Sequence, residues 1–204
     1  MSESIKKVLD LTKLQVGDII LVHTPFNLWQ PLTWLSWLIR FFTKDYYNHA
    51  AIVGYSNSPI VIPINPFYPS MYTDVQSVES GVISDPLSTQ ISGCDIKIRR
   101  YDKLMSPTND QLNQLVTRIN SFRGIPYDIP GCLIFQLIKQ LGNDVFPGSD
   151  IWLEQHQKDG AKRFYCSELV ACCLKLPNWW ELSPADLDVH INLSTIYEGI
   201  VIFS

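Results

Sequence analysis

The stretch KRFYCSELVACCLKL, residues 162–176, holds three of the five cysteines of the chain. If a helix begins at Cys166 and ends near Leu176, its apolar positions form one inward face that includes Cys173. Cys166 differs, because the unpaired N–H groups and the dipole of a first helical turn stabilise a thiolate. The stretch therefore predicts a buried helix with a candidate nucleophile at its start. The alternative is that all three cysteines only pack as small apolar side chains.

The composition favours one globular domain, which we place over residues 1–204. Of these residues 46% are hydrophobic and 18% are charged, which is enough apolar material for a core, and the net charge of −4 argues against a nucleic-acid partner. An odd number of cysteines, two of them adjacent, does not suit a disulfide framework. The N-terminal residues lack the apolar stretch of a signal peptide, so we expect a reduced, cytoplasmic protein.

Metal-binding spacing is missing from the sequence. There is no CxxC pair, and the histidines are scattered without an HxxxH pair: His23, His49, His156 and His190. We therefore expect neither a structural metal nor a cofactor.

Hydrophobic periodicity predicts an α+β fold, with strands first and helices later. Strands are expected over 16–23, 48–55, 59–64, 80–87, 94–101 and 196–203, helices over 106–122, 132–142 and 166–176, and a loop over 66–80. The Trp-rich stretch 26–42 is too short and too interrupted to span a bilayer. It is expected to be a helical insertion packed on the core, and the alternatives are an interfacial membrane helix or a hydrophobic substrate lip.

A catalytic cysteine needs a base, and the base needs a group that orients it. His49 is the best candidate, because it stands at the head of the expected strand 48–55, directly after a polar turn. His23 ends its own strand and is the second candidate. A capped, partly exposed histidine without a catalytic role is the alternative for His49.

Five segments occur together in a characteristic order. They are GDIILVH (17–23), YYNHAAIVGY (46–55), SGVISDPL (80–87), GIPYD (124–128) and RFYCSELV (163–170). This set resembles the permuted NlpC/P60 superfamily of papain-like cysteine hydrolases, and within it the YiiX/YaeF-like amidase branch. The resemblance covers most of the chain from about Val16. It implies a circularly permuted papain-like fold, in which a small antiparallel sheet packs against helices.

The resemblance also implies roles for single residues. Cys166 would be the nucleophile, His49 its base, and Tyr127 of the GIPYD segment a contact for the substrate or the oxyanion. Relatives carry a glutamate as third residue on the strand after the histidine strand, where this chain has IVIPINP with Pro63. Asn65 would share the face of that strand and is our candidate for the third role. Asp74 and Glu79 are further candidates.

Together with the resemblance, Cys166 and His49 predict a thiol hydrolase of amide bonds, a cysteine peptidase or amidase. A small peptide-like or cell-wall-derived substrate is what the resemblance implies. The same fold carries lipid acyl transfer and phospholipase-type acyl hydrolysis. An acyl-lipid substrate, with contact to a membrane surface, is therefore the first alternative, and activity that depends on vesicles or micelles would identify it. The second alternative is a catalytically inactive binding module, which an inert Cys166 would favour.

Overall fold

The computed structural model describes residues 13–23, 46–55, 72–78, 81–86, 93–126, 128 and 162–201. Several of our predictions fall outside these ranges: the helical insertion at 26–42, the strand at 59–64, the helix at 132–142, and the site residues Asn65 and Tyr127.

The described strands form one antiparallel sheet. In chain order they are β1 (Ile19–His23), β2 (His49–Tyr55), β3 (Tyr72–Val78), β4 (Gly81–Pro86), β5 (Asp95–Tyr101) and β6 (Leu193–Ile200). Across the sheet the order is β4-β3-β2-β1-β5-β6, so the last strand of the chain pairs with β5 at one edge. Strand β2 lies inside the sheet, between β1 and β3.

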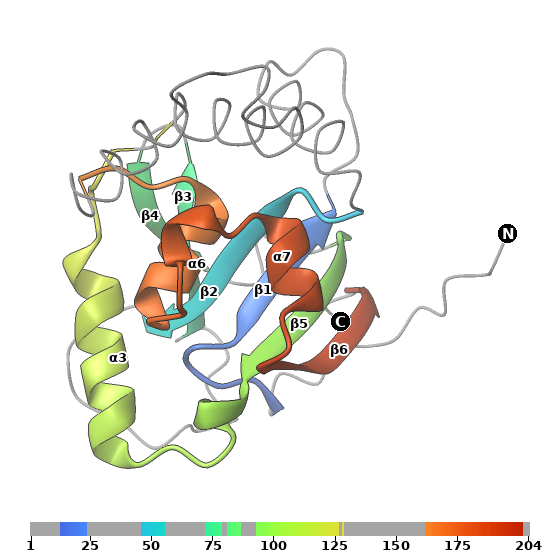
Figure 1. Cartoon of the computed structure of the whole chain (residues 1–204), viewed down its shortest axis with the longest axis horizontal. Coiled ribbons are helices and arrows are strands. Elements are labelled where there is room, and N and C mark those ends of the chain that lie inside the picture. The colour runs from blue at the N-terminus through green and yellow to red at the C-terminus, as the bar shows by residue number, and fades with distance from the viewer. Residues whose placement is uncertain are drawn as a thin grey trace, which may run out of the picture.

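Helices cover one face of this sheet. They are α3 (Asn109–Ser121), α6 (Cys166–Cys173) and α7 (Pro184–Val189), with the short 3-10 turns η3 (Asp102–Leu104) and η4 (Trp179–Glu181). Helix α6 contacts β2 and β3, and α7 contacts α6 and β6 (Figure 1). The architecture is α+β, as the sequence predicts. No helix within the described ranges combines the length and the apolarity that a membrane span requires.

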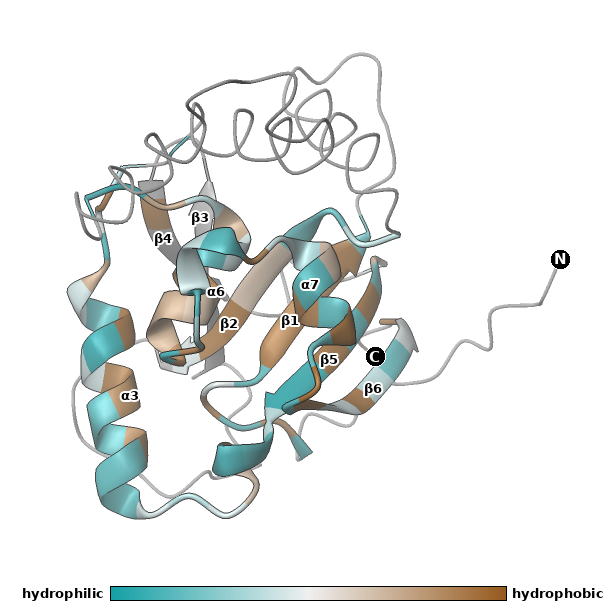
Figure 2. Cartoon of the chain, viewed as in Figure 1, coloured by the Kyte–Doolittle hydropathy of each residue, from teal (hydrophilic) through white to brown (hydrophobic). Residues whose placement is uncertain are grey.

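The two faces of the sheet belong to separate apolar clusters. The α6-side cluster includes Ile19, Leu21, Ala50 and Ile52 from the strands, together with Leu169 of α6. Residues in alternate positions, such as Ile20, Ala51 and Val53, belong to the cluster on the other face. Figure 2 shows the matching pattern on α3, with apolar colour toward the sheet and polar colour away from it. In the central strands, side chains alternate between the two faces of the sheet, so both faces of these strands are buried.

Helix α3 begins where its capping pattern predicts. Thr108 accepts a hydrogen bond from the N–H of Gln111, and the Gln111 side chain accepts one from the N–H of Thr108. The inward positions Leu115, Val116 and Ile119 are buried. Reciprocal capping together with this apolar stripe explains why the helix could be found from sequence.

Two expectations were wrong. The stretch 66–80 was expected to be a loop, but its residues 72–78 form β3. This strand pairs with β2 on one side and β4 on the other, so its main chain is held by two ladders although its sequence is largely polar. The cysteine helix was expected to reach Leu176 but ends at Cys173, and Lys175 adopts a left-handed φ of 52°.

Candidate active site

Cys166 is the first residue of α6 and is only 1% exposed. Its predecessor Tyr165 is extended, with φ −89° and ψ 170°, and the Tyr165 hydroxyl donates to the carbonyl of Trp180 at 2.9 Å. The N–H of Tyr165 donates to the buried carboxylate of Glu168 at 3.3 Å. Such a carboxylate in the first turn satisfies a main-chain donor and fixes where the helix starts. The thiol is thereby held at the helix start, against β2.

The structure brings Cys166 and His49 together. The thiol and the imidazole form a side-chain hydrogen bond, and the N–H groups of Ala50 and Ser167 donate to the same sulfur. Burial is the largest single influence and raises the pKa of the thiol. The hydrogen bond and charge of His49, with the two N–H donors, outweigh burial, so the pKa lies below its ordinary value. The site therefore favours a thiolate, the reactive form of cysteine.

The position of the sulfur follows from how β2 and β3 pair. The N–H of Val53 points toward β1, because it donates to the carbonyl of Asp18 at 2.8 Å. The N–H of Ala50, an odd number of residues away, therefore points toward the β3 side. The ladder between β2 and β3 ends at the pair Ile52–Val75, before it reaches Ala50. The Ala50 N–H is thus left outside the ladder, and the Cys166 sulfur accepts it.

His49 is the first residue of β2 and pairs in register with Val22, but the alternation of the strand does not continue into the residues before it. Tyr47 and Ala50 both belong to the α6-side cluster, although residues three apart in a regular strand lie on opposite faces. The lead-in segment, which we define as residues 46–48, is not part of the strand, and the N–H of Asn48 donates to the carbonyl of Val22 at 3.2 Å. Irregularities of this kind re-aim side chains next to active sites. The direction of the His49 ring therefore depends on how the lead-in segment is held.

The second candidate base has another environment. His23 ends β1, and its ring stacks on Tyr46 with centroids 4.0 Å apart. Its Nδ1 lies 2.8 Å from the carbonyl oxygen of Tyr46. Both contacts join His23 to the lead-in segment, whereas the histidine that bonds the Cys166 sulfur is His49.

The register of β3 bears on the third catalytic role. Asp74 pairs with Val53, four residues along β2 from His49. At about 3.3 Å per residue this is about 13 Å along the strand, too far for a direct hydrogen bond to the imidazole. The expectation that Asp74 could fill the third role is therefore wrong. Asn65 and Glu79 lie outside the described residues.

The GIPYD segment lies directly beside the cysteine helix. The N–H of Asp128 donates to the carbonyl of Phe164 at 3.0 Å, and the N–H of Phe164 donates to the carbonyl of Pro126 at 3.1 Å. Phe164 is two residues before Cys166. These two bonds bring the described ends of the segment, which flank Tyr127, next to the start of α6.

The other described cysteines differ from Cys166. Burial raises the pKa of Cys172 to about 11, helped by the charge of Glu168 and opposed by that of Arg118. Burial also raises the pKa of Cys94 and of Cys173. Among the cysteines that the structure describes, Cys166 alone has a lowered pKa.

The sequence did not single out several residues of this site. Glu168 is 2% exposed, and its signal was its place three residues after the cap, as in a capping box. Tyr47 and the N–H of Ala50 left no signal, because their roles come from contacts with distant strands. Across the described ranges, no three His, Cys, Asp or Glu side chains are grouped as metal ligands would be.

Comparison with known proteins agrees with this architecture. The crystal structure of the metalloprotein YiiX from Escherichia coli O157:H7, assigned to DUF1105, superposes with a TM-score of 0.54 at 17% identity, and the match covers 90% of this chain and 97% of YiiX. The chain has a YiiX-like fold. At this identity the likeness extends to the fold and not to the activity. No protein-family profile matches the chain, and no curated protein matches it.

Proposed function

We propose that this protein is a thiol hydrolase of amide bonds with a permuted papain-like NlpC/P60 arrangement. Cys166 is the nucleophile and His49 the base. The observation that carries the proposal is their hydrogen bond at the start of α6, together with the lowered pKa of the buried thiol. A cysteine that only packs has no need of two N–H donors and an imidazole around its sulfur, and its pKa would be raised by burial, as it is for Cys173.

In the first half of the reaction His49 takes the proton of the Cys166 thiol, and the sulfur attacks the carbonyl carbon of the amide. The tetrahedral oxyanion is stabilised by N–H groups in the first turn of α6, which have no acceptor within the helix. When the C–N bond breaks, the imidazolium of His49 gives its proton to the departing amine. The acyl group remains on Cys166 as a thioester.

In the second half water attacks the thioester. His49 removes a proton from the water, the C–S bond breaks, and the sulfur leaves as a thiolate that recovers a proton from His49. The products are a carboxylic acid and an amine, and no redox partner is consumed. The proposed substrates are small peptide-like amides, including fragments derived from cell walls, in line with the resemblance of the sequence motifs.

YiiX is a metalloprotein, which raises the question of a metal in this chain. Thiolate and imidazole are good ligands for zinc, but a site held by protein needs at least three such side chains. The described residues bring together only Cys166 and His49, and hold no group of three. They do not fit a resident metal, so every step proposed above uses the side chains and main chain alone.

The test is hydrolysis of a panel of short peptide amides and esters, with mass spectrometry of the protein during turnover. Wild type and Cys172→Ala should turn over and accumulate an acyl adduct on Cys166, whereas Cys166→Ala and His49→Ala should lose turnover. Cys172 is a matched control because it lies on the same helix and is half-buried. Turnover that survives Cys166→Ala would refute the proposal, and activity found only with phospholipid vesicles would make the substrate an acyl lipid.

A further inference from the structure

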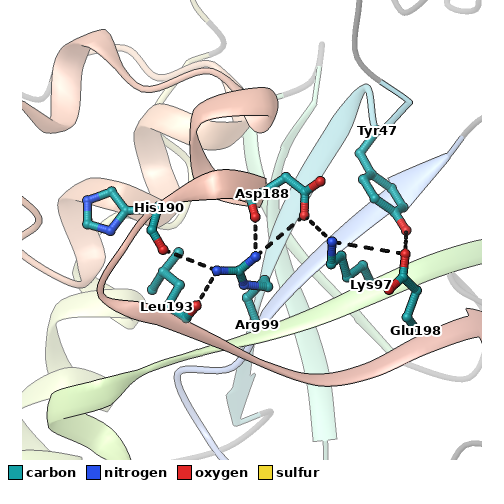
Figure 3. A network of polar contacts seen from close by, with 7 residues as sticks. All are labelled: Tyr47, Lys97, Arg99, Asp188, His190, Leu193 and Glu198. Carbon is teal, nitrogen blue, oxygen red and sulfur yellow. Dashed lines mark hydrogen bonds and ion pairs between the residues drawn. The ribbon is translucent and has the colours of Figure 1, made fainter.

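Tyr47 is anchored inside the protein, two residues before His49. It is 3% exposed and belongs to the α6-side cluster. Its hydroxyl donates to Glu198 Oε1 of β6 at 3.3 Å, and the ammonium of Lys97 lies 5.9 Å from the centre of its ring (Figure 3). The hydrogen bond crosses from the lead-in segment to the edge strand of the sheet. A buried hydroxyl with one such partner has a defined orientation.

The anchor continues into β5 and α7. Lys97 Nζ lies 2.7 Å from Asp188 Oδ1 and 4.0 Å from Glu198 Oε1, so one cation bridges the two carboxylates. Asp188 Oδ1 is also 3.6 Å from the guanidinium of Arg99. Because these side chains come from β5, β6 and α7, the Tyr47 hydroxyl is held by three elements that fix one another (Figure 3). A network of this kind is stiffer than a single surface ion pair.

Arg99 attaches this network to the main chain that follows α7. Arg99 is 8% exposed, and its guanidinium donates to three carbonyl oxygens, those of Asp188, His190 and Leu193. The turn between α7 and β6 is therefore fixed at the point where Asp188 meets Lys97. Asp188 is therefore held in place, and through Lys97 it keeps one cation beside Glu198, whose own side chain is 57% exposed.

We propose that Tyr47 is a positioning residue for His49, and that its anchor on Glu198 and Lys97 holds the imidazole against Cys166. This inference rests on the proposed function, because the orientation of the His49 ring matters for the reaction only if His49 is the base for Cys166. Without the anchor, residues 46–48 can relax toward regular alternation, and a shift of one residue moves a side chain to the opposite face. The Tyr47 anchor acts together with the contacts of Tyr46 with His23 and Asp95, and it is the one that fixes the residue two positions before His49.

The charges around Tyr47 suit this role across the physiological range. Burial raises the pKa of the phenol, and the carboxylates Glu198, Asp95 and Asp188 raise it further. The hydroxyl thus keeps its proton and remains a donor at any pH at which the thiol reacts.

The experiment compares Tyr47→Phe with Tyr101→Phe. Tyr101 is a close match: it lies in the same cluster, is 8% exposed, and has the ammonium of Lys103 5.7 Å from its ring centre. Its hydroxyl makes no hydrogen bond to the described residues. The readout is the pH dependence of Cys166 alkylation. Tyr47→Phe should shift the profile to higher pH and slow alkylation at neutral pH about threefold, as a rise of about one pKa unit gives once the higher nucleophilicity of the more basic thiolate is counted. Tyr101→Phe should match wild type.

A second pair of variants tests the acceptor. Glu198→Ala should reproduce the effect of Tyr47→Phe, whereas Glu198→Gln keeps an acceptor oxygen and should restore the wild-type profile. The NMR resonances of the His49 ring give a measure that does not depend on thiol chemistry. They should shift in Tyr47→Phe and Glu198→Ala and stay in place in Tyr101→Phe.

The two proposals fail in different ways. If wild-type Cys166 alkylates no faster than Cys172 but the His49 resonances still respond to Tyr47→Phe alone, the hydrolase proposal fails and the positioning role stands. If the profile and the resonances of Tyr47→Phe equal those of wild type, or if Tyr101→Phe changes them equally, Tyr47 has no positioning role.

Discussion

Replacing His49 by alanine is expected to lower the reactivity of the Cys166 thiol below that of an ordinary cysteine. Four contributions lower the pKa of this thiol against burial, and two of them, the hydrogen bond and the charge, come from His49. With both removed and burial unchanged, the pKa should rise toward that of Cys172, which burial places at about 11. His49→Gln keeps a hydrogen-bonding group without the charge and should have a smaller effect.

The magnitude follows from the thiolate fraction. A thiol with the ordinary pKa of 9.0 is about one hundredth ionised at neutral pH, and a pKa of about 11 reduces this fraction about a hundredfold. The more basic thiolate is a better nucleophile, which recovers about half of that loss on a logarithmic scale. The alkylation rate at neutral pH should therefore fall about tenfold below that of an ordinary thiol, and further below the rate of wild type.

The assay is iodoacetamide labelling over a range from about pH 5 to about pH 10, with the modified cysteine identified by peptide mapping. Cys94 and Cys172 serve as references within the same molecule, because burial raises the pKa of both. Circular dichroism establishes that the variant is folded. An unchanged Cys166 profile in folded His49→Ala would show that the imidazole does not activate the thiol, and the reasoning about this pair would be wrong.

Three further changes test the fold that holds the site. Gly17→Ala should lower the free energy of unfolding in urea by about 2 kcal/mol or more, because φ is +93° and the added Cβ would lie 2.6 Å from a methyl of Leu115. Equal urea midpoints for the variant and wild type would contradict this. Arg99→Met leaves three carbonyl oxygens without their donor and should lower the free energy of unfolding by about 3 kcal/mol. No measurable decrease would show that water replaces the guanidinium. Thr108→Ala breaks the cap on Gln111 and should cost about 1 kcal/mol, whereas Thr108→Ser should restore most of it.

The parts of the fold that sequence could predict are those with a local physical cause. Helix α3 carries a capping box and an apolar stripe, and β1 and β2 are runs of buried β-branched and small residues, so each could be found from its own residues. Strand β3 could not, because what holds its polar stretch in the sheet is pairing with β2 and β4 and not its own composition. Local sequence contains no record of such partners.

The same division applies to the site. Cys166 could be chosen because a helix start lowers the pKa of a thiol, and His49 because it heads a strand, and both arguments are local. The anchor of Tyr47 depends on Glu198, which is 151 residues further along the chain. It also depends on the lead-in segment, whose Tyr47 lies on the α6 side although regular alternation would place it on the other face. No periodicity expresses a contact of this kind, so the residues that orient the base had to come from the structure.

Strand β2, which carries His49, precedes helix α6, which carries Cys166, by more than half of the chain, and this order bears on biosynthesis. Strands β1 to β5 leave the ribosome first and contain His49 and the Ala50 donor, so much of the environment that activates the sulfur exists before Cys166 is made. Until α6 docks on β2, the nascent thiol has the modest reactivity of any exposed cysteine. The lowered pKa of the thiol then arises only when α6 has docked, which limits oxidation of Cys166 while the chain is still incomplete.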